Sequence, residues 1–101
     1  MGSKFMDYIA TQEQPVLADF WAEWCGPCRM MHPVLESVAK DWKGKASVVK
    51  INSDEQPDLA SRFGIHSLPT FVMFKDGREV HRVSGARPAA ALKAEFASWV
   101  T

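Results

Sequence analysis

The segment Trp24-Cys25-Gly26-Pro27-Cys28 contains both cysteines of the chain and lies between an apolar, strand-like stretch and a helix-like one. With two residues between the cysteines, the first turn of a helix brings the two sulfurs within reach of a disulfide bond. The helix would start at Cys25, where unpaired N–H groups and the positive end of the helix dipole favour a thiolate. Because the thiolate is the form that attacks disulfides, the segment predicts a strand followed by a helix that carries a redox-active pair.

Two other interpretations of the cysteine pair are a structural disulfide and one half of a zinc site. A bond between Cys25 and Cys28 would close a very short loop, and the stabilisation from a disulfide grows with the length of the loop. A zinc site needs further cysteines or histidines at ligand spacing, and Pro27 does not suit the turn that zinc ligands form. The redox interpretation is therefore favoured over both.

The size and composition of the chain indicate one globular domain, residues 1–101. With 101 residues, of which 47% are hydrophobic, the chain can bury a single core. Twelve basic and twelve acidic residues cancel, so no net field draws the protein to nucleic acid or to anionic membranes. No transmembrane span or apolar signal segment is recognisable, and two cysteines used for redox chemistry fit a reducing cytosol. We therefore expect a cytoplasmic monomer without nucleic-acid or membrane partners.

Hydrophobic periodicity and turn residues predict the order helix, strand, helix, strand, helix, strand, strand, helix. The expected helices are residues 4–11, a helix that Pro27 opens, that Pro33 kinks and that Gly44 ends, residues 57–63, and a last helix from Pro88. The expected strands are residues 16–21, 48–52, 70–75 and 79–84, the last two joined by a turn at Asp76-Gly77. Two parallel crossovers followed by a hairpin predict an α/β fold with a mixed sheet between helical layers.

Asp19 is an acidic residue inside the apolar strand predicted for residues 16–21. It alternates in step with Leu17 and Trp21, so its carboxyl group is expected to point into apolar surroundings. Burial raises the pKa of a carboxyl group, and a buried carboxylate near Cys28 could accept the proton of that thiol. The alternative is an exposed acid on a half-buried strand.

The residues Asp19-Phe20-Trp21-Ala22-Glu23 and the cysteine segment that follows them resemble the active site of the thioredoxin family. The similarity covers nearly the whole chain from Pro15 onward and includes Pro33, Lys50-Ile51-Asn52, Phe63-Gly64-Ile65, Leu68-Pro69-Thr70, Phe74-Lys75-Asp76-Gly77 and Gly85. The resemblance implies a thioredoxin fold with a mixed sheet of four strands flanked by about four helices. Too few residues precede Pro15 to form the extra first strand of the family, so that edge strand is expected to be short or missing.

The resemblance also implies a function. Cys25 would attack disulfides of protein substrates, Cys28 would resolve the mixed disulfide, and Asp19, tuned by Lys50, would accept the proton of Cys28. A thioredoxin reductase would recycle the protein, and neither a metal nor an organic cofactor would be needed. The activity implied is that of a protein-disulfide reductase.

Two further functions remain as alternatives to the reductase. A disulfide oxidase or isomerase has the same chemistry, but Gly26-Pro27 and the aliphatic Leu68 are less typical of these enzymes. A thioredoxin-fold subunit that binds a larger enzyme would leave no recognisable signal in the sequence.

The resemblance further implies a substrate surface. Pro69 matches the cis-proline loop of the family, and the backbone of Leu68 would pair with an incoming substrate chain. We use the term docking surface for the mostly apolar set Trp24, Gly26, Pro27, Leu68 and Gly85. Ser84 lies where the family tends to have an aliphatic residue, which predicts an altered preference for partners.

Two histidines depart from the family pattern and are candidate modulators. His32 follows Cys28 by four residues, on the same face of the predicted helix, and His66 lies in the loop before Pro69. A protonated imidazole at either position would favour a nearby thiolate and make the redox chemistry depend on pH. The alternative is an ordinary surface histidine.

Overall fold

The computed structural model describes residues 3–100, and its elements follow the predicted order. The helices and strands are α1 (Ser3–Thr11), β1 (Val16–Trp21), α2 (Gly26–Asp41), β2 (Ser47–Asn52), α3 (Pro57–Arg62), β3 (Thr70–Lys75), β4 (Arg78–Ser84), α4 (Ala89–Phe96) and the short 3₁₀ helix η1 (Ala97–Trp99). The prediction of a four-stranded α/β fold is confirmed.

The four strands form one mixed sheet in the order β2-β1-β3-β4. β1 pairs in parallel with β2 and antiparallel with β3, and β3 pairs antiparallel with β4. Within residues 3–100 no strand precedes β1, so β2 and β4 are the edges of the sheet, as expected for a sheet that lacks the first family strand. The pairing of β3 with β4 shifts register at Met73/Phe74.

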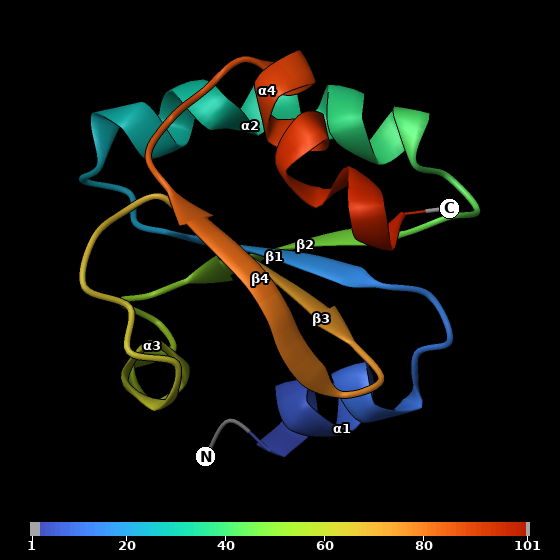
Figure 1. Ribbon diagram of the computed structural model, residues 1–101. Helices are drawn as coiled ribbons and strands as arrows, with labels where there is room; N and C mark the ends of the chain where they lie inside the picture. The colour runs from blue at the N-terminus through green and yellow to red at the C-terminus, as the bar shows by residue number, and fades with distance from the viewer. Residues whose placement is uncertain (1–2, 101) are drawn as a thin grey trace.

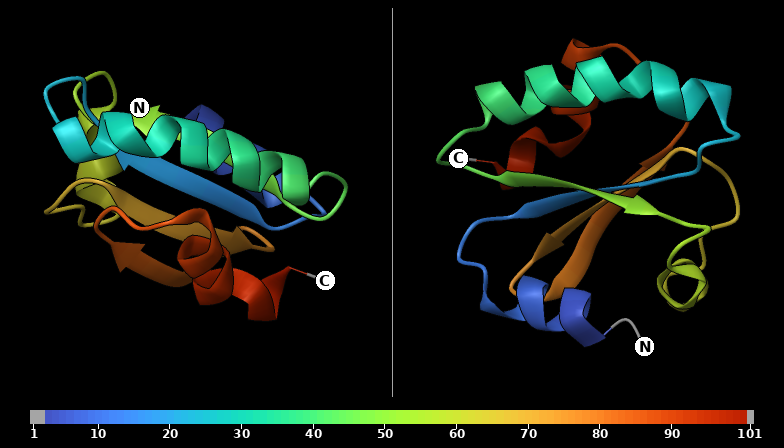
Figure 2. Two further views of the ribbon diagram at one scale, coloured as in Figure 1. Left: turned by 90° about the horizontal axis from the view of Figure 1, so that it is seen from above. Right: turned by 180° about the vertical axis from the view of Figure 1, so that it is seen from behind.

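Helices cover both faces of the sheet: α2 and α4 lie on one face, and α1 and α3 lie on the other (Figures 1 and 2). Successive residues of β1 point to opposite faces, so Leu17 packs under α2 and α4 while Val16, Ala18 and Phe20 pack against α1 and α3. Because β1 is central and covered on both sides, five of its six residues are fully buried. The strand therefore places the segment that follows it at the carboxyl end of the sheet, beside the start of α2.

Turn chemistry explains the hairpin and the ends of the helices. Asp76 and Gly77 both have positive φ (55° and 79°), which is the conformation of a two-residue type I′ turn, as predicted. The end of α2 differs from the prediction: the helix stops at Asp41, and Gly44 (φ 83°) lies in the turn beyond it. The buried Trp42 caps the helix, and its carbonyl oxygen accepts N–H groups from the following turn, which ends the helical ladder before the glycine.

Candidate active site

Cys25 and Cys28 form a disulfide bond at the N-terminus of α2, with their Cα atoms 5.3 Å apart. Cys25 is the N-cap residue of the helix rather than its first residue, and its Sγ accepts the N–H group of Cys28 at 3.3 Å. Cys25 is 5% exposed and Cys28 is fully buried, so only Cys25 of the two residues reaches the surface. Among residues 3–100 no cluster of three or more histidine, cysteine or acidic residues could hold a metal ion. Both cysteine sulfurs are bonded to each other in this structure.

The two residues between the cysteines face solvent. Pro27 lies in the first turn of α2, where the N–H group that proline lacks would have no partner in the helix. A Cβ atom on Gly26 would meet nothing within 4 Å, so the space beside this glycine is open. Neither residue brings a charge or a hydrogen-bond donor to the sulfurs.

Asp19 is fully buried, as predicted, and neither of its carboxylate oxygens has a hydrogen-bond partner within residues 3–100. Burial raises the pKa of Asp19 from an ordinary value of 3.8 to about 7, and the positive charge of Lys50 opposes this shift. Lys50 is the residue opposite Asp19 in the parallel pairing of β1 with β2, and it is exposed because β2 is an edge strand. The carboxyl group can therefore gain or lose a proton near neutral pH.

The loop before β3 packs against the disulfide. The Leu68–Pro69 peptide bond is cis, as the family resemblance implied. Leu68 packs against the buried group formed by Ala22 and the two cysteines. The structure therefore brings the cysteine segment and the proline loop together although about forty residues separate them in the sequence.

Gly85 follows β4 and closes the same region from the other side. Its N–H group donates to the carbonyl oxygen of Pro69 at 2.8 Å, and its φ of 100° is one that favours glycine. Within the chain a Cβ atom there would meet only the Arg87 side chain, at 3.9 Å, so no close contact inside the fold requires glycine. The backbone conformation is therefore the reason for glycine at this position. The Ser84 hydroxyl lies 2.8 Å from Thr70 Oγ1 and is used inside the fold.

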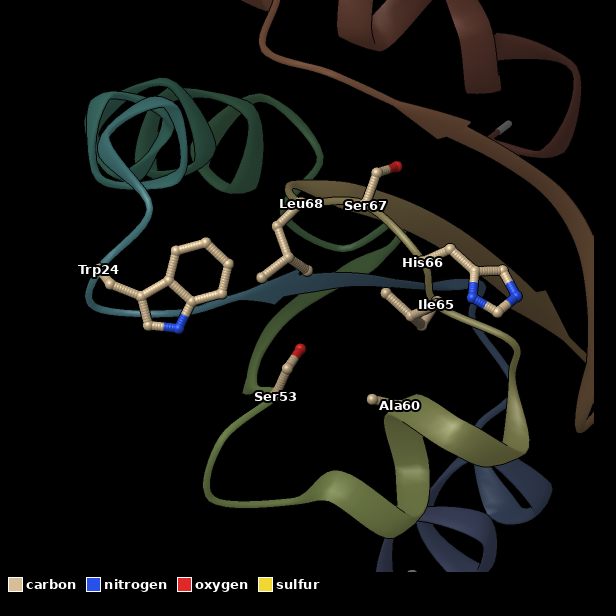
Figure 3. A pocket seen from close by; sticks show the side chains of 7 residues that line it. All are labelled: Trp24, Ser53, Ala60, Ile65, His66, Ser67 and Leu68. Carbon is tan, nitrogen blue, oxygen red and sulfur yellow. The ribbon is translucent and has the colours of Figure 1, made fainter.

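Trp24 is 71% exposed, and its indole N–H group donates to Asp54 Oδ2 at 2.9 Å. Beside it lies a depression of about 200 Å³, which we call the Trp24 hollow (Figure 3). Its lining residues are Trp24, Ser53, Ala60, Ile65, His66, Ser67 and Leu68. Most of this lining is apolar, and Trp24 and Leu68 extend it to the docking surface.

Three residues of this region, Ser53, Asp54 and Met30, were not predicted from the sequence. Ser53 and Asp54 directly follow β2, and the pairing of Trp21 with Asn52 places the ends of β1 and β2 side by side. Residues after the carboxyl ends of adjacent parallel strands meet at one edge of a sheet, and this rule would have identified both Ser53 and Asp54.

Met30 is 73% exposed and shares a second depression with Gly26, Pro27 and Arg29. The sequence signal that could have identified Met30 is an apolar side chain at a position of α2 that faces outward.

The two candidate histidines have different surroundings. The His32 ring stands edge-on to Trp21, with ring centroids 4.7 Å apart. Burial lowers the pKa of His32, Lys50 and Arg29 lower it further, and Glu36 opposes them. A lowered pKa disfavours the charged imidazole at this position, and the role of His32 as a modulator stays a prediction. His66 is exposed at the end of the Trp24 hollow opposite Trp24 (Figure 3), and its role stays a prediction.

A disulfide that joins the N-cap of a helix to the third residue of that helix, beside a cis-proline loop at the carboxyl end of a mixed sheet, defines a dithiol–disulfide oxidoreductase. Residues 1–98 match the sequence model of the thioredoxin family. The chain belongs to the thioredoxin family and is a protein-disulfide reductase whose partners are disulfide-containing proteins and a reductase.

Relatives from several lineages show the same relationship. The chain is 49% identical over 90 residues to thioredoxin 1 of Nostoc sp., with 89% of this chain and 84% of that protein covered. It is 52% identical over 85 residues to a thioredoxin of Alicyclobacillus acidocaldarius, with 84% and 81% covered. The crystal structure of thioredoxin NaTrxh from Nicotiana alata superimposes with a TM-score of 0.88 at 33% identity, over 98% of this chain and 84% of that one. None of the helices described in residues 3–100 has the length and apolar character needed to cross a membrane.

Proposed function

We propose that Cys25 is the attacking residue and Cys28 the resolving residue of this oxidoreductase. The observation that carries the assignment is the difference in exposure, because Cys25 has some surface open to a substrate and Cys28 has none. The Cys25 thiolate attacks one sulfur of a substrate disulfide, forms a mixed disulfide and releases the other sulfur as a thiolate. Cys28 then attacks Cys25 Sγ, which closes the Cys25–Cys28 bond and frees the second substrate thiol. Two electrons pass to the substrate, and the reductase returns two electrons to the pair.

Asp19 accepts the Cys28 proton in this proposal, and Lys50 adjusts the pKa of Asp19. A carboxyl group with a pKa of about 7 can take a proton and lose it again at neutral pH, which suits an acid–base group that must turn over. The resolving step would then be the one that depends on Asp19.

Substrates bind, we propose, across the docking surface, with Leu68 and Pro69 on one side of the disulfide and Gly85 and Ser84 beyond them. The exposed Trp24 indole and the open Gly26-Pro27 segment supply apolar contact area next to Cys25. The backbone of Leu68 offers hydrogen bonds to an extended substrate chain.

The protein acts, in our proposal, as a cytoplasmic reductant and as a monomer, with residues 1–101 forming one domain. A net charge of zero supports the absence of nucleic-acid and anionic-membrane partners. The decisive experiment is to equilibrate the protein with glutathione and to measure the fraction of Cys25–Cys28 disulfide. A strongly negative potential, together with reduction of insulin in the presence of dithiothreitol, supports the reductant. A potential near that of glutathione or above it would identify an oxidase or isomerase instead.

Replacing Pro27 by histidine should make the protein more oxidising. An imidazolium beside Cys25 stabilises its thiolate and therefore the reduced state, and a gain of about 1.4 kcal/mol raises the potential by roughly 30 mV. Equilibration of Pro27→His with glutathione at pH 6 and pH 8 measures the change, which should be larger at pH 6 because the imidazole is then charged. A potential that stays the same or falls would show that this position does not tune the pair.

A further inference from the structure

The hydroxyl groups of Thr70 and Ser84 form a chain of hydrogen bonds between the proline loop and the end of β4. The two residues are partners in the antiparallel pairing of β3 with β4. Thr70 Oγ1 lies 2.6 Å from the carbonyl oxygen of Ser67 and 2.8 Å from Ser84 Oγ. Ser67 directly precedes the cis peptide bond between Leu68 and Pro69, so the chain of hydrogen bonds starts in the loop that packs against the disulfide.

The direction of each hydrogen bond in this chain follows from the chemistry of its atoms. A carbonyl oxygen can only accept, so the Thr70 hydroxyl must donate its single proton to the carbonyl oxygen of Ser67. Thr70 Oγ1 then has no proton left for Ser84 and must accept, which makes the Ser84 hydroxyl the donor of the second bond. Hydrogen bonds that are aligned in this way polarise and strengthen one another. The proton of the Ser84 hydroxyl is therefore directed into the protein.

The outward side of the Ser84 hydroxyl carries only lone pairs. Ser84 is exposed, whereas Thr70 is buried. Within residues 3–100 no group donates a hydrogen bond to Ser84 Oγ. A hydroxyl oxygen has two lone pairs and one proton, and here the proton is engaged by Thr70. The end of β4 therefore presents a hydroxyl that can accept a hydrogen bond from an incoming chain but has no proton to give it.

Arg87 holds the backbone that carries this acceptor. Its Nη2 donates to the carbonyl oxygen of Ser84 at 2.7 Å, and its Nε donates to the carbonyl oxygen of Gly85 at 3.3 Å. The N–H group of Gly85 is bonded in turn to the carbonyl oxygen of Pro69. An acceptor on a support that is fixed before binding loses little conformational entropy when it binds. The positive charge of Arg87 beside Ser84 also disfavours a donor that is itself a cation.

We propose that Ser84 is a specificity-determining residue, which accepts a hydrogen bond from an uncharged donor of the substrate chain, such as the side-chain amide of asparagine or glutamine. The inference rests on the proposed function and names the substrate class of that site. A substrate chain that pairs with the backbone of Leu68 would pass Pro69, and Gly85 and Ser84 lie directly beyond that proline. An aliphatic side chain at this place would cover the lone pairs of Ser84 without offering a donor, which costs free energy. A carboxylate would bring a second acceptor against the first.

The test uses peptide disulfides that differ at one position, which carries asparagine or leucine, two side chains of similar size. This position is moved in turn over the residues on either side of the cysteine. At one position the ratio of kcat/KM for asparagine over leucine should be about 3- to 10-fold higher in wild type than in Ser84→Ala, the factor that one net hydrogen bond supplies. Ser84→Thr keeps the hydroxyl and should keep the wild-type ratio. Ser61→Ala is the matched control, since Ser61 is an exposed serine of α3, and it should also keep that ratio.

A ratio that is the same in wild type and Ser84→Ala at every position would overturn the proposal, and so would an equal fall in Ser84→Thr. If Ser84 only held the proline loop in place, Ser84→Ala would lower kcat/KM for both peptides by one factor and leave the ratio unchanged. A lysine peptide should be reduced more slowly than the asparagine peptide at the sensitive position, and the reverse order would overturn the preference for an uncharged donor. If wild type reduces insulin but shows no dependence on Ser84, only this inference is wrong; if it does not reduce insulin either, the proposed function fails with it.

Discussion

Cys25→Ser should reduce insulin no faster than dithiothreitol alone, whereas Cys28→Ser should become trapped on its substrate. The first variant lacks the thiol of the only residue of the pair that reaches the surface, so no attack takes place. In the second variant attack survives, but the buried thiol that would release the substrate is missing. Mass spectrometry of Cys28→Ser after incubation with a disulfide substrate should find up to one covalent adduct per protein, on Cys25.

A serine-to-alanine change far from the site provides the control for these variants. Ser37 lies on the exposed side of α2, and Ser37→Ala should reduce insulin at the wild-type rate without forming adducts. Activity retained in Cys25→Ser, or adducts found on Cys28 in that variant, would reverse the assigned roles. Absence of any adduct in Cys28→Ser would remove the resolving role from Cys28.

Asp19→Ala should be more stable than wild type at pH 8 and should lose most of that advantage at pH 4. The folded-state pKa of Asp19 is about 7 and its ordinary value is 3.8, so between these values the folded state binds more protons than the unfolded state. The stability of wild type therefore falls as pH rises through this window and levels off above it. The difference in free energy of unfolding between variant and wild type should grow by about 2 to 4 kcal/mol from pH 4 to pH 8. The cavity left by the carboxyl group lowers the variant's stability at both pH values.

Urea unfolding of both proteins at pH 4 and pH 8 measures this difference in free energy of unfolding. The other titrating groups are the same in both proteins, so their contributions cancel. Asp19→Asn is the companion variant, because it keeps the volume of the side chain and cannot ionise. Both variants should also slow turnover at neutral pH, where Cys28 needs a proton acceptor. A stability difference that does not change with pH would mean that Asp19 ionises normally in the folded protein, and unchanged turnover would remove it from the mechanism.

The fold and the reacting pair could be predicted because local signals decide them. The apolar run of β1, the Asp76-Gly77 turn and the proline in the first turn of α2 each act within a few residues, and the predicted strand bounds hold within one residue. Alternation with Leu17 and Trp21, together with the family resemblance, predicted that Asp19 is buried, and the structure confirms it because β1 is central and both of its faces are covered.

The remainder of the site depends on contacts between distant segments. The bond from Trp24 to Asp54 joins residues thirty positions apart, and no pattern in either segment indicates it. The Trp24 hollow likewise needs α3, the end of β2 and the loop before β3 in their final positions. The lowered pKa of His32 follows first from partial burial, and the ring packs edge-on to Trp21; spacing along a helix shows neither.

The two open edges of the sheet bear on how the protein behaves in a crowded solution. A strand with unpaired N–H and C=O groups can recruit strands of other molecules and so seed aggregation. β4 carries Arg78, Glu79 and Arg82, with Arg82 bonded both to Glu79 and to the carbonyl oxygen of Phe63, and the register shift beside it interrupts a regular ladder. β2 carries the exposed Lys50. Charge and irregularity at these edges discourage growth by strand addition. The extended substrate chains of our proposal would therefore pair with the protein beside its disulfide and not along the edges of its sheet.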